Sequence, residues 1–177
     1  MADVQLALLR AINVGGKNIV PMRDLTVIFQ AAGCLNVRTF IQSGNVIFTP
    51  GPKTPAHLPA VVSTKISEQF GLRVPVILRT AKQLRETISH NPLPGEEEAL
   101  SVMFLADLPE PAKVAALDAN RSRPDRFFVR GREIYLHLPN GARSKLTNAW
   151  FDAQLSTVST VRNWRTVNKL LSLMEPE

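Results

Sequence analysis

A glycine-rich segment near the N-terminus has the residue types of a phosphate-binding loop. It reads RAINVGGKN, runs from Arg10 to Asn18 and follows an apolar stretch. Glycines allow backbone N–H groups to turn towards an anion, and Arg10 and Lys17 add positive charge nearby. It is not a Walker loop, because Ala11 stands where that motif has its first glycine and Asn18 where it has a hydroxyl. A tight turn with a solvated lysine is the structural alternative.

The charge of Arg10 requires either a carboxylate or a ligand as its partner. Arg10 lies at the end of a stretch that is apolar on both alternating faces, where a guanidinium must either pair with a carboxylate or contact a ligand. Asp3 and Asp24 are the candidate partners for a structural ion pair. In the ligand-binding alternative, Arg10 points out of the sheet edge into a pocket that Lys17 and Asn45 also reach.

A second group of cations and hydroxyls lies in the segment ARSKLT, residues 142–147. The segment precedes an expected helix, and a helix N-terminus with flanking cations is a ready anion site. The alternative for Thr147 is a role as helix cap only. The candidate ligand-binding residues are therefore Arg10, Asn13, Gly15, Gly16, Lys17, Asn18, Gln42, Ser43, Gly44, Asn45, Arg143, Ser144, Lys145 and Thr147.

Trp164 is flanked by Arg162 and Arg165, so it could stack on a ligand. It also shares a helical face with Val167 and Leu171, which favours a place in the core.

Groups that transfer protons are scarce in these motifs, which contain Asn, Gln, Ser, Arg and Lys. We find no nucleophile–base pair, no His or carboxylate cluster, and no Cys/His spacing for zinc, so neither a metal nor a cofactor is expected. Three functions stay open: binding of a phosphate-bearing ligand (a nucleotide or nucleic acid), catalysis by a transferase or hydrolase on a small phosphorylated substrate, and a protein-interaction module.

The charge distribution favours an anionic partner. The chain carries a net charge of +6 and a pI near 10.0. Residues 91–120 have one basic and six acidic side chains, whereas residues 121–169 have ten basic and three acidic ones. A basic surface of this kind predicts weak, salt-sensitive binding to nucleic acid, and a solvated face without a partner is the alternative.

The composition indicates a soluble protein. No apolar run approaches the ~18 residues that a membrane span requires. The first fourteen residues lack the basic start and cleavage site of a signal peptide, so we expect a cytoplasmic protein without a membrane partner.

The element pattern of the first half is β-α-β-β-α-β. It comprises a strand at 4–12, a helix from Pro21 to Gly33, a hairpin at 36–50 with a two-residue Ser-Gly or Gly-Asn turn, a helix ending near Gly71 and a strand at 74–79. This order is that of the ferredoxin-like split βαβ. Because its first two strands run parallel, the loop after Arg10 and the Gln42–Asn45 turn should meet at one sheet edge.

The second half repeats this scheme after a linker helix with a Thr80–Gln83 capping box. Its hairpin, RFFVRGREIYLHL, has Gly131-Arg132 as the turn. This register puts Phe127, Val129, Ile134 and Leu136 on a core face and Arg126, Phe128, Arg130, Glu133, Tyr135 and His137 on the other. The second face mixes arginine with aromatics, as base-stacking surfaces do, or else packs under the first sub-domain.

The fold class expected is α+β, with two ferredoxin-like sub-domains, mainly antiparallel sheets and C-terminal helices. The first sub-domain covers residues 1–80 and the second covers residues 81–177.

Four segments in order along the chain, LLRAINVGGKN, FIQSGNVIF, ARSKLT and TVRNWRTVNKLL, resemble the bacterial family catalogued as domain of unknown function 1697. That family typically has Gly at the position of Ala11 and Tyr at that of Phe40. The resemblance implies a cytoplasmic α+β protein of bacterial type, and it brings no established reaction.

Overall fold

The computed structural model describes residues 3–93 and 95–175, which form two compact units. The first unit contains the described residues up to Leu84 together with those from Leu170 onward, and the second runs from Arg85 to Lys169. The boundary predicted from the sequence lay between residues 80 and 81, and the whole C-terminal helix was expected in the second sub-domain.

The first unit is a ferredoxin-like sheet with two helices. Its elements are β1 (Gln5–Leu9), α1 (Met22–Ala31), β2 (Cys34–Phe40), β3 (Asn45–Pro50), α2 (Leu58–Phe70) and β4 (Val76–Thr80). The strand order is β2-β3-β1-β4, and each neighbouring pair is antiparallel. Since β3 is antiparallel to both β1 and β2, those two strands run parallel, which confirms the predicted topology.

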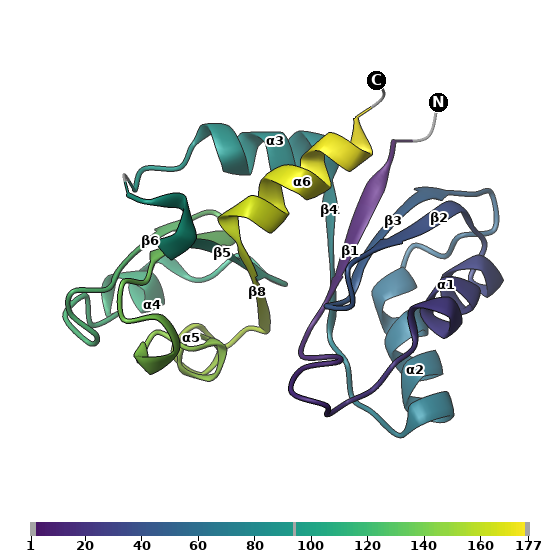
Figure 1. The fold of residues 1–177 in the computed structure, drawn as a ribbon, viewed down its shortest axis with the longest axis horizontal. Coiled ribbons are helices and arrows are strands. Elements are labelled where there is room, and N and C mark those ends of the chain that lie inside the picture. The colour runs from purple at the N-terminus through teal and green to yellow at the C-terminus, as the bar shows by residue number, and fades with distance from the viewer. Residues whose placement is uncertain (1–2, 94, 176–177) are drawn as a thin grey trace. The chain divides into compact units, whose positions relative to one another are not determined.

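Helices α1 and α2 lie side by side on one face of this sheet (Figure 1). Helix α1 starts after Pro21, whose φ of −60° suits a helix entry, and it buries Leu25, Ile28 and Phe29 as expected. The Phe29 ring packs 5.5 Å from that of Phe48 on β3. Burial of such side chains contributes about 1.5–3 kcal/mol each, so this face anchors the unit.

The β2–β3 connection differs from the predicted two-residue turn. Phe40 pairs with Asn45, so the loop between them contains four residues, from Ile41 to Gly44. The Asn45 side chain is fully buried and its Nδ2 donates hydrogen bonds to the Phe40 carbonyl and to Ser43 Oγ, both at 3.0 Å. These two bonds stabilise the four-residue loop. The prediction of a two-residue turn rested on dipeptide preferences, which take no account of such side-chain hydrogen bonds.

The second unit repeats the topology. Its elements, after the linker helix α3 (Ala81–Ser89), are the 3₁₀ turn η1 (Glu97–Ala99), β5 (Leu100–Leu105), α4 (Pro111–Ala115), β6 (Arg126–Arg130), β7 (Glu133–His137), η2 (Gly141–Arg143), α5 (Asn148–Leu155) and β8 (Ser159–Asn163). Helix α6 (Trp164–Met174) begins in this unit, and its residues from Leu170 onward belong to the first unit. The strand order β6-β7-β5-β8 is again antiparallel throughout, and α4 and α5 lie together on one face (Figure 1). Strand β8 was not predicted.

The duplication extends to single hydrogen bonds at the ends of corresponding strands. The N–H of Leu9 donates to the Gly44 carbonyl, as the N–H of Leu105 donates to that of Arg132, both at 2.8 Å. The fourth strand of each unit also has a buried arginine as its penultimate residue, which donates to the carbonyl of the residue before it: Arg79 to Leu78 at 2.9 Å and Arg162 to Val161 at 2.8 Å.

A capped helix follows each of these arginines. Gln83 Oε1 accepts from the Thr80 N–H at 2.9 Å and the Gln83 N–H donates to Thr80 Oγ1 at 3.1 Å, which confirms the predicted capping box. At the start of α6, Asn163 Oδ1 accepts from the Thr166 N–H at 2.8 Å.

The β6–β7 register agrees with the sequence pattern. Phe127 pairs with Leu136, and Val129 pairs with Ile134, and all four contribute to the core beneath α5. On the opposite face Tyr135 is buried, and its hydroxyl donates to the Thr87 carbonyl at 2.7 Å. None of the helices in the described part of the chain combines the length and apolar character needed to cross a membrane.

Candidate anion-binding site

The glycine segment forms a small hairpin. Val14 and Lys17 are bridged, and the Lys17 N–H donates to the Val14 carbonyl at 3.0 Å. The two residues between them have φ angles of +56° (Gly15) and +73° (Gly16), the left-handed values that a type I′ turn requires. Nothing lies within 4 Å of a Cβ built on either glycine, and Lys17 is exposed. The glycines therefore form a hairpin tip that extends into solvent.

The Asn13 side chain stabilises the base of this hairpin through hydrogen bonds. Its Nδ2 donates to the carbonyls of Val20 and Gln42, both at 2.9 Å, and its Oδ1 accepts from the Val20 N–H at 2.8 Å. The bond to Gln42 joins the glycine segment to the β2–β3 loop. Asn18 also stabilises the segment, because its Nδ2 donates a hydrogen bond to the Ala11 carbonyl at 3.0 Å. Both side-chain amides stabilise the loop itself.

Gly44 brings the β2–β3 loop against the end of β1. Its φ is +80°, and a Cβ built there would lie 2.7 Å from Leu9 Cβ and 2.9 Å from Ile12 Cδ1. Only glycine fits this approach without displacement of its neighbours. The two loops thus lie at the same edge of the sheet, as the strand order predicts. Gln42 is exposed and Ser43 half-buried there.

Arg10 lines a pocket of about 220 Å³ at this edge. The Arg10 N–H donates to the Pro75 carbonyl at 3.1 Å, which joins the end of β1 to the segment before β4. The pocket is lined by Arg10, Ala11, Asn18, Leu72, Arg73, Val74 and Pro75. Lys17 and Asn45 are not among these residues, since Lys17 lies at the hairpin tip and Asn45 is buried beneath its own loop. The second cation of the pocket is Arg73 instead.

The chemistry of this lining suits an anion. Two guanidinium groups supply planar arrays of donors that match phosphate or carboxylate oxygens in paired hydrogen bonds. Among the described lining residues there is no Asp, Glu, His or Cys. The side chains can therefore bind and stabilise negative charge, whereas proton transfer has no obvious carrier there.

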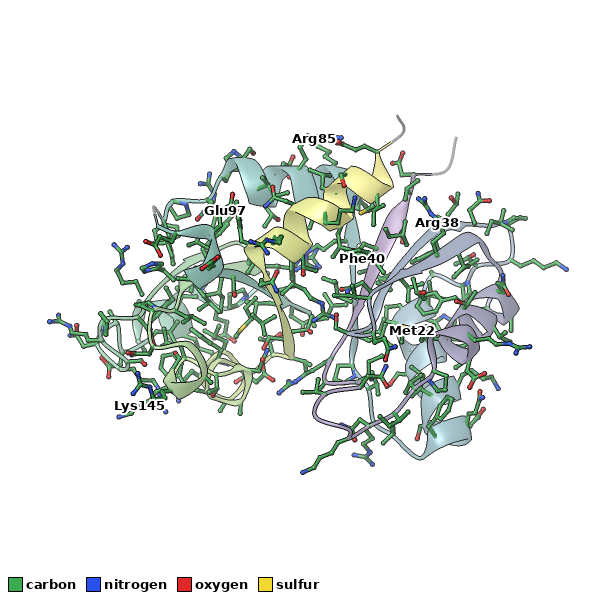
Figure 2. All side chains as sticks on the ribbon, in the orientation of Figure 1. Met22, Arg38, Phe40, Arg85, Glu97 and Lys145 are labelled. Atoms are coloured by element: carbon green, nitrogen blue, oxygen red, sulfur yellow. The ribbon has the colours of Figure 1, made fainter. Side chains whose placement is uncertain are left out.

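A larger pocket in the second unit, of about 310 Å³, has a mixed charge. It is lined by Glu97, Glu98, Asn163 and Arg165, and Glu97 is labelled in Figure 2. Two carboxylates repel an anion, and the Asn163 side chain already caps α6. The smaller pocket beside Arg10 is therefore the better candidate for an anion.

The predicted cluster at Arg143–Thr147 belongs to the second unit, and its Ser144 hydrogen-bonds the carboxylate of Asp125. Asp125 is 2% exposed and accepts from Ser122 Oγ at 2.7 Å, from the Asn140 N–H at 2.9 Å and from Asn140 Nδ2 at 3.1 Å. Burial on its own raises the pKa of Asp125, but hydrogen bonds from Ser144 and the other neighbours outweigh it and lower the pKa below 3.8. This carboxylate thus stays charged at neutral pH.

Most polar groups of the cluster bond within the protein. The Lys145 N–H donates to Ser122 Oγ at 2.9 Å, and Ser144 Oγ accepts from the Leu146 N–H at 3.1 Å. Thr147 Oγ1 accepts from the Trp150 N–H at 3.3 Å, so Thr147 caps α5. The side chains of Arg143 and Lys145 are exposed, and Lys145 is labelled in Figure 2.

Trp164 lies in the core, as its helical face indicated: it is 9% exposed, and Val167 on the same face is fully buried. Burial lowers the pKa of the neighbouring Arg162 to about 10.

The single cysteine, Cys34, is buried, and burial raises the pKa of its thiol more than the hydrogen bond with Thr54 lowers it. No group of three or more His, Cys, Asp or Glu side chains within the described chain is arranged to hold a metal ion.

Two charged residues, Arg73 at the pocket beside Arg10 and Asp125 in the second cluster, were missed in the sequence. Arg73 lies in the short segment before β4, and only the pairing of β4 with β1 brings it to Arg10. Asp125 lies in a polar, basic segment that gives no sign of burial. The antiparallel β1–β4 pairing of a ferredoxin-like sheet was the one available signal, because it puts the start of β4 beside the end of β1.

Comparison with known proteins places the chain in a family. The family model described as "Protein of unknown function (DUF1697)" matches residues 3–135. The chain belongs to the DUF1697 family. Among solved structures, this DUF1697 chain is similar to conserved bacterial protein SP0830 from Streptococcus pneumoniae, with 19% sequence identity and a TM-score of 0.69. The match covers 99% of this chain and 100% of that one, so the two share the fold along their whole length. A search of curated proteins gave no match.

Proposed function

We propose that this protein binds a phosphate-bearing anionic ligand, a nucleotide or a nucleic acid, through the pocket beside Arg10. The observation that carries the proposal is the pair of guanidinium groups, Arg10 and Arg73, on one small pocket whose described lining residues include no carboxylate. The net charge of +6 supports it, because excess positive charge steers anions towards the protein.

The size of the pocket indicates which part of a ligand enters. Sites that enclose whole small molecules are typically about 300–1,000 Å³. At about 220 Å³, this pocket suits a phosphate group and the atoms next to it, with the rest of the ligand outside. Its walls are fixed in advance by the Arg10–Pro75 and Asn18–Ala11 hydrogen bonds, so little ordering is required on binding.

The same lining favours binding over catalysis. A transferase or hydrolase needs a group that takes or gives a proton, and the described lining residues offer amide, guanidinium and apolar side chains. We also propose a cytoplasmic location in a bacterial cell, as expected from the sequence. The buried, free thiol of Cys34 is in keeping with a reducing compartment.

Titration with inorganic phosphate, pyrophosphate and AMP, followed by NMR on the backbone N–H signals of residues 10–18 and 72–75, tests the proposal. Arg73→Met should weaken binding about 10- to 100-fold, since a hydrogen bond to a charged group contributes about 1.5–3 kcal/mol. Arg23→Met is the matched control, because Arg23 is exposed on α1 and lies outside the pocket lining. Signals that do not move with any of the three ligands would disprove the proposal.

A further inference from the structure

Strand β6 presents an exposed aromatic side chain between two exposed arginines. It is an edge strand of the second sheet and pairs with β7 alone. Phe127 and Val129 point to the core beneath α5, so Arg126, Phe128 and Arg130 share the opposite face. Phe128 is 46% exposed, and both arginines are exposed. We call these three side chains the β6 platform.

Fold stability explains only part of this pattern. Charged residues on an edge strand prevent pairing with other chains, which accounts for the two arginines. It does not account for Phe128, because a large exposed apolar side chain on an edge strand favours association. Phe128 lies opposite Tyr135 on the neighbouring strand. The Tyr135 ring is buried and its hydroxyl is bonded to Thr87, so the packing of Tyr135 does not require the exposed ring of Phe128.

The spacing of the β6 platform suits a flexible polyanion with flat rings. The arginine Cα atoms are four residues apart along an extended strand, or about 13 Å, and Phe128 lies midway between them. Single-stranded nucleic acids bind where aromatic rings stack on bases and cations follow the backbone. A base stacked on Phe128 would have its two flanking phosphates within reach of the arginine side chains.

One nearby carboxylate opposes this charge. Glu133 pairs with Arg130 across the β6–β7 ladder, and Arg126 pairs with His137. Glu133 and Arg130 act with opposite sign on the pKa of buried Tyr135, which burial, the larger cause, raises to about 12. By strand register, Glu133 and Arg130 lie on the face of the sheet that carries Phe128, so Glu133 reduces the positive potential there.

We propose that the β6 platform binds single-stranded nucleic acid, with one base stacked on Phe128 and phosphates on Arg126 and Arg130. Stacking is possible with every base, so sequence preference is weak. The platform lies in the second unit, so this proposal is independent of the pocket beside Arg10.

Fluorescence anisotropy of the full chain with labelled 12-mers of oligo(dT) and oligo(rU), at low and moderate salt, tests the proposal. Phe128→Ala should weaken binding about 5- to 100-fold, as loss of one stacked base predicts. Arg126→Gln and Arg130→Gln should each lower the log–log salt slope by about 0.7. Glu133→Gln should strengthen binding, a change of sign that general damage to the sheet would not produce.

Two further variants separate stacking from other modes of binding. Phe128→Leu keeps an apolar side chain but removes the ring, so it should lose most of the affinity, while Phe128→Tyr should keep it. Leu35→Ala is the control, since Leu35 is 50% exposed on β2, the edge strand of the other unit. Absence of binding at low salt, or a Phe128→Leu variant that binds as well as the wild type, would overturn the proposal. The second result would indicate an apolar partner such as a peptide strand.

Discussion

Gly44→Ala should destabilise the protein far more than Gly16→Ala, because the two glycines have similar backbone angles but different surroundings. Their φ angles are +80° and +73°, so both substitutions incur the left-handed backbone cost of about 1–2 kcal/mol. A Cβ at position 44 would also lie 2.7 Å from Leu9 Cβ, whereas a Cβ at position 16 meets nothing within 4 Å.

The difference between the two variants isolates the steric cost of the close approach. Overpacking of this kind costs about 1–3 kcal/mol. Alanine at either position also restricts the unfolded chain, which returns about 0.4–1 kcal/mol in both variants and cancels in the difference. We therefore expect the free energy of unfolding to fall by about 1–3 kcal/mol more for Gly44→Ala than for Gly16→Ala.

Urea denaturation followed by far-ultraviolet circular dichroism measures both free energies, because both tryptophans lie in the second unit and would not report on the first. Equal losses for the two variants would refute the close packing of the β2–β3 loop on β1. That packing fixes the strand end from which Arg10 extends, so the refutation would extend to the geometry of the pocket.

The remaining predictions concern two other positions. Asp125→Ala should lower the free energy of unfolding by about 2 kcal/mol or more, since buried donors left without an acceptor cost about 1–3 kcal/mol each; a loss under 0.5 kcal/mol would contradict the role of Asp125. Because the folded pKa of Asp125 lies below its ordinary value, its stabilisation is complete above about pH 4 and is lost as the pH falls through the folded pKa. Asp125→Asn should therefore unfold less steeply with acid below about pH 4, as measured by thermal melts between pH 2 and 5. Ala11→Gly should raise the free energy of unfolding by about 0.5–1 kcal/mol, because Ala11 has a φ of +54° and the relief of about 1–2 kcal/mol exceeds the entropic cost of glycine; a decrease would contradict this assignment.

The topology could be predicted because its signals are local. Alternating apolar residues, the Thr80–Gln83 box and the Gly131-Arg132 turn each define an element without reference to the rest of the chain. Strand β8 was missed because its buried residues, Ser159, Thr160 and Arg162, are all polar. Polar residues in the sequence indicate a loop unless the hydrogen bonds that satisfy them in a buried strand are known. One such bond runs from Arg162 Nη1 to Thr160 Oγ1 at 2.8 Å.

The candidate site could be predicted only in part for the same reason. Arg10 and Asn18 stand out in the sequence because they frame a glycine-rich loop, and both line the pocket. Arg73 is distant in sequence and reaches the pocket through strand pairing. Asn45 begins β3, directly after a loop that its side-chain hydrogen bonds stabilise, so its burial cannot be inferred from residue type.

The most direct test of the proposed function is the dissociation constant of Arg10→Met for pyrophosphate, measured together with its melting temperature. If Arg10 binds the ligand, affinity should fall about 10-fold or more while the melting temperature stays the same or rises slightly, because a guanidinium near apolar walls is replaced by an apolar side chain. If Arg10 serves a structural ion pair, the melting temperature should fall and the affinity should stay as in the wild type. Unaltered affinity would remove Arg10 from the site and contradict the proposed function.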